Sequence, residues 1–275
     1  HARVIMLARS FTEVLGQRRP SAERADLTRI ALSLMIINSW IAQPEVLPTL
    51  RDLLAEVGSG SATPAIAAIT TVVLAVTTVP HHDWIETERL AESGQPAVRS
   101  VAWQALSHVR ENEGDLVGAV KAAERALVGA SETEGPWFRA VVAAQLAGLY
   151  SQLGRFDEAR PHAETAVPVL MRLGARDDAL QAMAVTAIGH LESGELDLAE
   201  RVIEETTALM TPGGQQGAEG ALLTTRAEIA FARGDDADGC RLMRAAADAM
   251  SALRFPAMGP DADLAPWTIY GTSVA

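Results

Sequence analysis

Apolar residues recur at helical spacing along most of the chain, in stretches of about four turns. Residues 97–111 and 137–153 are two such stretches, and each is followed by a glycine, Gly114 or Gly154. Glycine is the residue that most easily adopts the left-handed conformation that ends a helix. No long segment alternates apolar and polar residues as a half-buried strand does. The pattern therefore predicts an all-α protein.

The helical stretches repeat in a constant register. Four turn glycines lie at positions 40 residues apart: Gly114, Gly154, Gly194 and Gly234. Five positions later comes a small residue: Ala119, Ala159, Ala199 and Gly239. An acidic residue that can cap the next helix follows three of the glycines: Asp115, Glu195 and Asp235. We expect pairs of helices joined by tight turns, with loops between pairs at 129–136, 174–178 and 211–214.

This pattern resembles the tetratricopeptide repeat, in which a leucine, a small residue and an aromatic residue precede the turn glycine. The unit that matches best contains Leu146, Ala147, Tyr150, Gly154, Phe156, Ala159 and Ala166. Departures are Arg110 and His190 at the aromatic position and Arg226 where leucine is expected. The resemblance implies a right-handed superhelical solenoid of about six helix–turn–helix units, longer than the usual unit of about 34 residues.

The repeats divide the chain into two regions of one continuous array. Residues 1–96 contain degenerate N-terminal units, with helices expected at 22–40, 44–57 and 63–79. Residues 97–275 contain the clearer units, and residues 266–271 look like the start of a further first helix. Terminal units of a stack are normally atypical and polar on their outer face. We therefore expect a fragment of a larger protein with a truncated last unit.

An uncharged run between Val57 and His82 could be mistaken for a membrane span. A membrane helix needs roughly 20 mostly apolar residues, usually with Lys or Arg at the cytoplasmic flank. Here the flanks carry Glu56, Asp83 and Glu86, and five threonines dilute the run. We expect a helix buried between its neighbours and no membrane contact.

The formal net charge of −12 argues against nucleic acids as partners. Nucleic-acid binding normally needs a basic surface, so we expect no direct contact between this segment and DNA or RNA. Cys240 is the single cysteine, which excludes a disulfide within the chain and fits a reducing, cytoplasmic location.

No catalytic, cofactor or metal motif stands out. The sequence lacks a phosphate-binding loop and the short motifs of zinc peptidases and serine hydrolases. His81, His82 and Asp83 fit a polar turn better than a metal site, which needs three or four converging ligands. The adjacent pairs 177–178 and 204–205 point to different sides of a helix, so they are expected on a solvated face. We expect no enzyme activity, no cofactor and no metal.

The resemblance also implies where a ligand would bind. In tetratricopeptide arrays the first helices form a concave surface, which here would carry Gln104, His108, Glu111, Gln145, Gln152, Gln181, Glu192, Thr224 and Glu228. This row of amides and carboxylates could hold an extended peptide or the polar edge of a small ligand. The alternatives are a hydrated groove that binds nothing and a groove filled by another domain of the same protein. The row lacks the Lys, Arg and Asn cluster that holds a carboxylate terminus.

A narrower resemblance concerns the parent protein. Long alanine- and arginine-rich repeats such as LGRFDEARPHAETAV, with APWTIYGTSVA, resemble the C-terminal arrays of large actinobacterial antibiotic regulatory proteins of the signal-transduction ATPase class. This implies that the segment is the sensor region of a transcription regulator and controls DNA-binding and ATPase modules elsewhere in the parent chain. The sensor region would bind a protein segment or other domains of the same polypeptide, and it could oligomerise. One alternative is a free-standing scaffold or adaptor. The other is a receptor for a small-molecule effector, with a deep pocket lined by Trp84 or Trp103.

Overall fold

The structure, a computed structural model, describes residues 22–42, 46–57, 64–77, 84–130, 135–210 and 216–251. These ranges contain twelve helices and no strand, which confirms the all-α prediction. The helices are α2 (Ala22–Ala42), α3 (Leu47–Glu56), α4 (Pro64–Val76), α5 (Ile85–Ala91), α6 (Pro96–Asn112), α7 (Leu116–Gly129), α8 (Gly135–Gln152), α9 (Phe156–Leu173), α10 (Arg176–Glu192), α11 (Leu196–Leu209), α12 (Gln216–Ala232) and α13 (Asp236–Ser251).

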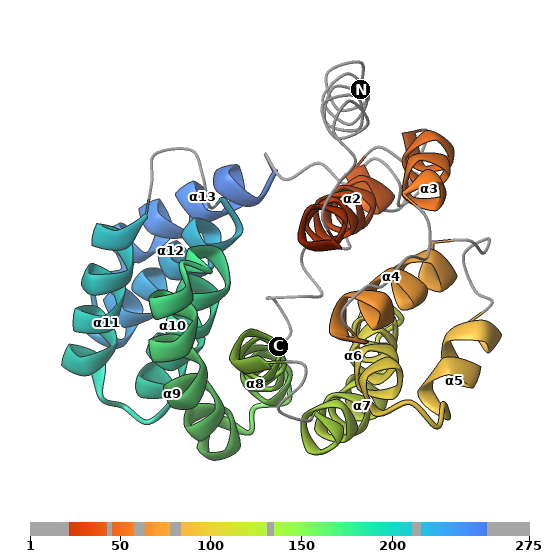
Figure 1. Cartoon of the computed structure of the whole chain (residues 1–275). Coiled ribbons are helices and arrows are strands. Elements are labelled where there is room, and N and C mark those ends of the chain that lie inside the picture. Colours follow the sequence, from red (N-terminus) through yellow and green to blue (C-terminus); the bar gives the residue numbers. More distant parts are fainter. Residues whose placement is uncertain are drawn as a thin grey trace.

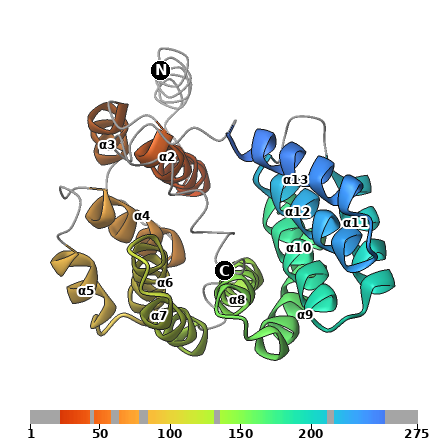
Figure 2. The same ribbon diagram turned by 180° about the vertical axis from the view of Figure 1, so that it is seen from behind.

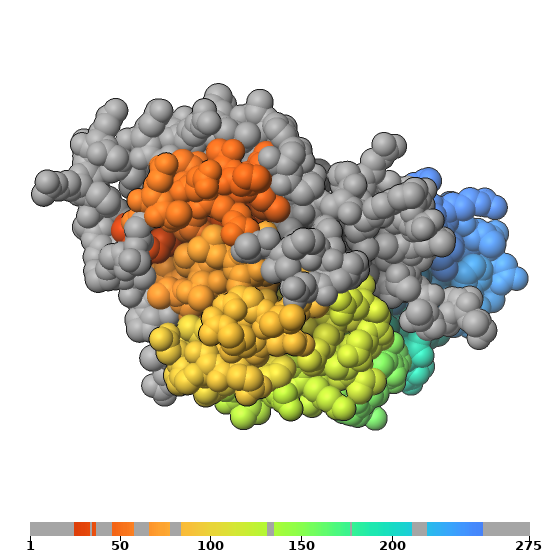
Figure 3. All heavy atoms as spheres, turned by 90° about the vertical axis from the view of Figure 1, so that its right-hand side faces the viewer, coloured from red at the N-terminus to blue at the C-terminus, as the bar shows by residue number. Residues whose placement is uncertain are grey.

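The last eight helices pack as consecutive pairs, α6 with α7, α8 with α9, α10 with α11 and α12 with α13. The first helices of successive pairs also pack on one another, α8 on α10 and α10 on α12. Figures 1 and 2 show the helices following one another around an open arc, with α2 to α7 on one side and α10 to α13 on the other. In the side view of Figure 3, α3 to α7 form a continuous surface coloured from orange to yellow-green.

The turn inside each of these four pairs has the same backbone structure. At Gly154 the φ angle is 70°, the Gly154 amide donates to the Ser151 carbonyl at 2.9 Å, and the Arg155 amide donates to the Tyr150 carbonyl at 2.8 Å. The same two hydrogen bonds recur at Gly114, Gly194 and Gly234, all with positive φ. They satisfy carbonyls that the end of a helix leaves unpaired. The residue at the turn must be glycine because other side chains are strained at positive φ.

The expected acidic caps form at two turns and not at the third. Asp115 Oδ1 accepts from the Gly118 amide at 2.8 Å, and Asp235 Oδ1 accepts from the Asp238 amide at 3.0 Å. A Cβ atom at Gly118 would collide with the Asp115 carboxylate, which explains the glycine there. The cap expected of Glu195 is wrong, because its longer side chain turns back and its Oε2 lies 2.7 Å from Nδ1 of His190.

The segment 174–178 is not the loop that the sequence suggested. Helix α9 ends at Leu173 and α10 begins at Arg176. Gly174, with φ 76°, ends α9, and the Ala175 amide donates to the Leu170 carbonyl at 3.0 Å. The turn between two pairs is therefore as tight as the turns inside the pairs.

Small side chains bring the helices close together. Ala123, Ala126, Ala163 and Ala166 are fully buried, and Ala159 is 2% exposed. In the last pair the ring of Phe231 occupies the space that a Cβ of residue 239 would need, so Gly239 stands where the other units have alanine. Leucines complete the core: Leu106, Leu146, Leu149 and Leu170.

The N-terminal helices form a separate apolar cluster with α4. Leu32 and Ile36 of α2 and Leu50 of α3 pack there against Val73. Helix α4 is 13 residues long and also buries Ala68 and Val72. Within the described ranges, no helix has both the length and the apolar character that crossing a membrane requires. Residues 81–83, 266–271 and the first 21 residues, on which other sequence expectations rest, lie outside the described ranges.

Candidate functional site

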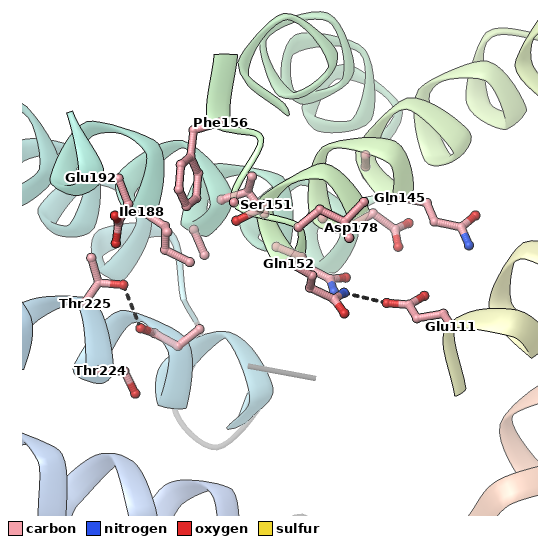
Figure 4. A pocket seen from close by; sticks show the side chains of 18 of the residues that line it. Glu111, Gln145, Ser151, Gln152, Phe156, Asp178, Ile188, Glu192, Thr224 and Thr225 are labelled. Atoms are coloured by element: carbon pink, nitrogen blue, oxygen red, sulfur yellow. Dashed lines mark hydrogen bonds between the residues drawn. The ribbon is translucent and has the colours of Figure 1, made fainter. Parts of the chain in front are cut away.

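A cavity of about 640 Å³ is lined mainly by one helix from each of the four C-terminal pairs, α6, α8, α10 and α12, together with the turn after α8 and the first residue of α9 (Figure 4). It contains eight of the nine side chains that the sequence placed on the concave surface: His108, Glu111, Gln145, Gln152, Gln181, Glu192, Thr224 and Glu228. The ninth, Gln104, lies one turn before His108, with its Nε2 3.0 Å from Nε2 of that histidine, and does not line the cavity.

Helical periodicity explains how one helix serves both the core and the cavity. On α8, Leu146, Leu149 and Tyr150 are buried in the core. The cavity face of the same helix consists of residues three or four apart, Val141, Ala144, Gln145, Gly148 and Gln152. The other three helices also contribute polar side chains, so a polar row crosses all four helices along the cavity.

Hydrogen bonds fix the polar row between α6 and α8. Gln152 donates from Nε2 to Glu111 Oε1 at 2.7 Å, as Figure 4 shows. Gln145 donates from Nε2 to Ser107 Oγ at 2.9 Å, and Ser107 in turn donates to the Ala119 carbonyl at 2.8 Å. The two glutamines thereby have defined orientations at the cavity wall.

At the other end of the cavity, Glu228 of α12 is half-buried. Burial raises the pKa of its carboxyl above the ordinary value, and the nearby charge of Glu192 raises it further. Thr224 and Thr225 donate their hydroxyl protons to the Gly220 and Ala221 carbonyls of their own helix, each at 3.0 Å. These hydroxyls therefore offer lone pairs to the cavity.

Several residues of this wall were not among those that the sequence placed there, and three of them are labelled in Figure 4. Asp178, expected on a solvated face, is half-buried and lines the cavity, and so do Ser151 and Phe156 (Figure 4). Asp178 lies three residues before Gln181, on the same helix face, so the spacing could have identified it. The sequence analysis considered Asp178 only with its neighbour, as a pair on a solvated face, and did not compare its position with that of Gln181.

The cavity is strongly acidic. Its wall carries four carboxylates, Glu111, Asp178, Glu192 and Glu228, and neither lysine nor arginine occurs among its described lining residues. Nowhere in the described part of the chain do three His, Cys, Asp or Glu side chains converge closely enough to hold a metal ion. The arrangement is suited to recognising a ligand through hydrogen bonds and charge.

The two tryptophans suggested as a small-molecule pocket lie elsewhere. Trp103 is 9% exposed, and the guanidinium of Arg125 lies 4.5 Å from its ring centroid. Trp84 packs beside the core and donates from Nε1 to Glu113 Oε1 at 2.9 Å. Neither side chain lines the cavity, so both act in packing between helices.

A second polar cluster joins α7, α8 and α9. The Tyr150 hydroxyl donates to Glu124 Oε1 at 2.7 Å, and its ring stacks on His162 with the centroids 5.6 Å apart. Burial, followed by the hydrogen bond to Glu124, raises the pKa of Tyr150 to about 12. Burial lowers the pKa of His162. Tyr150 of α8 thus links α7 and α9.

Comparisons with known proteins add little to this picture. No model of a known protein family matches the chain, and no curated protein matches it. Among solved structures, the chain is similar to one described as BtubC (BKLC) from P. vanneervenii, with 15% sequence identity and a TM-score of 0.49. That similarity covers 85% of this chain and 92% of the other.

Proposed function

We propose that this chain is an interaction module that binds an extended polypeptide segment in the cavity between α6, α8, α10 and α12. The observation that carries the proposal is that one face of each of these four helices contributes polar side chains to one continuous cavity. An extended peptide presents backbone amides and carbonyls along its length, and a row of Gln and Glu side chains on rigid helices matches such a ligand.

The proposed architecture is a right-handed solenoid of tetratricopeptide-like units. Its support is the identical pair of hydrogen bonds at Gly114, Gly154, Gly194 and Gly234 and the packing of α8 on α10 and of α10 on α12. Stacks of this kind place their first helices on the inner surface, where a ligand contacts several units at once.

In the wider proposal, the segment is the sensor region of a bacterial transcription regulator located in the cytoplasm. The occupant would then be a partner protein or another domain of the same polypeptide, and binding would restrain or release DNA-binding and ATPase modules. The support is the sequence resemblance at residues such as 153–167. The sequence of the complete gene tests this context: flanking DNA-binding and ATPase segments support it, and their absence favours a free-standing adaptor.

Blocking the cavity tests the binding proposal. A Cβ at Gly148 meets open space on the cavity face of α8, so Gly148→Phe would fill the cavity without a clash in the core. Gly94 is equally unobstructed but lies outside the cavity, which makes Gly94→Phe the control.

Both variants and the parent chain would be applied to an array of random ten-residue peptides, with circular dichroism to verify the fold. We expect a set of peptides that bind the parent chain and Gly94→Phe but do not bind Gly148→Phe. If no peptide distinguishes the two variants, the cavity is not a peptide site.

A small-molecule effector is the second candidate. The cavity volume of about 640 Å³ favours it, since ligand pockets typically measure about 300–1,000 Å³. The discriminating result is a compound that raises the thermal midpoint of the parent chain and of Gly94→Phe but not that of Gly148→Phe.

A further inference from the structure

We infer that the segment bound in this cavity is basic and places an arginine or lysine side chain among the cavity carboxylates. This inference rests on the proposed function and adds the chemistry of the ligand. Three features of the described wall carry it: its charge, its remaining hydrogen-bonding capacity and its apolar floor.

The charge of the wall comes from several helices that face one cavity. Glu111 belongs to α6, Glu192 and Asp178 to α10 and Glu228 to α12, while the described lining residues include no Lys or Arg. Glu228 is half-buried and its carboxyl feels the charge of Glu192. A cation between these two carboxylates would relieve their repulsion, whereas an anion would add to it.

Hydrogen bonding points to the same ligand by a different route. Four donors of the wall are already used: one N–H of Gln152 donates to Glu111, one N–H of Gln145 donates to Ser107, and the two threonine hydroxyls donate to carbonyls of α12. One acceptor of the wall remains. Gln145 Oε1 is buried and has no hydrogen-bond partner in the described part of the structure. A guanidinium group offers five N–H donors and no acceptor, so it complements such a wall.

The apolar floor favours a peptide over a free polyamine. Val141 and Ala144 of α8 and Val185 and Ile188 of α10 line the cavity between the polar groups. An extended peptide alternates its side chains, so that a basic residue can reach the carboxylates while its neighbours or its own methylene groups cover the aliphatic patch. A linear polyamine has only its own methylene groups to place on this patch, without the neighbouring side chains that a peptide adds.

The direct test compares two peptides that differ only in charge. Fluorescein-labelled (Ala-Arg)₄ is titrated with the chain by anisotropy, alongside the same peptide with citrulline for arginine, which keeps the shape and several donors but is neutral. We expect the arginine peptide to bind about tenfold more tightly or better, as close ion pairs in protein contacts do. Equal affinity for the two peptides would overturn the inference.

A chain with net charge −12 can also attract a basic peptide without a specific site. Two double variants with the same charge change separate these cases. The first, Glu192→Gln with Glu228→Gln, alters the cavity. The control, Glu204→Gln with Glu205→Gln, alters two exposed residues of α11 outside it. We expect about a tenfold loss of affinity in the first and less than about a twofold loss in the second. Equal losses would overturn the inference.

Two further results separate the ligand's chemistry from the proposed function. Spermidine that displaces the arginine peptide at equal concentration would show that the site takes small amines, and it would overturn the peptide assignment. If (Ala-Glu)₄ or neutral peptides bind the parent chain and do not bind Gly148→Phe, the cavity still binds peptides, but the inference that its ligand is basic is wrong. If Gly148→Phe affects no peptide of any charge, the proposed function fails as well. Circular dichroism and the thermal midpoint of each variant verify the fold.

Discussion

Glu228 illustrates at the scale of one residue how a binding site costs stability. Its carboxyl is half-buried and faces the charge of Glu192, so the folded state disfavours its ionised form and raises its pKa. For a carboxyl with a raised pKa, the penalty on the folded state grows as the pH rises above the unfolded pKa and is complete above the folded pKa. The penalty is absent at a pH below the unfolded value, where the group is protonated in both states.

Glu228→Gln should therefore stabilise the unliganded chain at neutral pH. We expect a gain of up to about 0.5 kcal/mol, limited because the side chain retains access to solvent. The gain should disappear at about pH 4 and below, near the ordinary pKa of glutamate. Urea denaturation of both proteins at pH 7 and at low pH measures this. Glu204→Gln is the control, since that side chain is exposed on α11. A midpoint that falls at pH 7 would contradict the prediction.

The sequence predicted residues of the cavity wall better than their interactions. The resemblance to tetratricopeptide arrays placed nine side chains on one surface, and the structure brings eight of them to the cavity. Orientation within the wall depends on partners from other helices, such as Ser107 of α6 for Gln145 of α8. Glu195 shows the same limit, because its preference for His190 over a cap depends on side-chain length and on a neighbour five residues away.

At the scale of the element, the tight turns are the most predictable feature. A glycine at the end of an apolar-periodic stretch predicts a turn because glycine adopts positive φ without strain. Four such turns were predicted in this way, and all four glycines have positive φ. The fifth, at Gly174, was missed because proximity to polar residues suggested a loop. Helix packing at Gly239 could not be predicted either, since it depends on the position of the Phe231 ring.

Gly154→Ala should destabilise the chain by about 1 kcal/mol, because alanine is strained at a φ of 70° although the space around its Cβ is open. Gly189→Ala is a matched control on α10, where the Cβ also meets open space and φ is not positive. There alanine should stabilise by about 0.5–1 kcal/mol, through its higher helix propensity. Thermal denaturation of the two variants gives both values. Shifts of the same sign would contradict the account of the turn.

At the scale of the whole molecule, charge determines which polymers can approach. With a net charge of −12, the chain repels a polyanion at long range. We expect no sequence-specific binding when the 275-residue chain is titrated against operator and random DNA duplexes at about 150 mM salt. Non-specific binders typically show dissociation constants of about 10⁻⁴ to 10⁻⁶ M under such conditions. Sub-micromolar binding that prefers one sequence would contradict this expectation.

The cavity wall extends from His108 to Glu228 and is formed mainly by four helices, which pack chiefly on helices next to them in the sequence. A row of units with nearest-neighbour contacts can fray at one end while the other end stays folded. An occupant that touches α6 and α12 together gives these separated helices a shared contact. Ligand binding would therefore make the four helices unfold as one cooperative block. A destabilising change in α8 or α10 would then also lower the stability of α6 and α12.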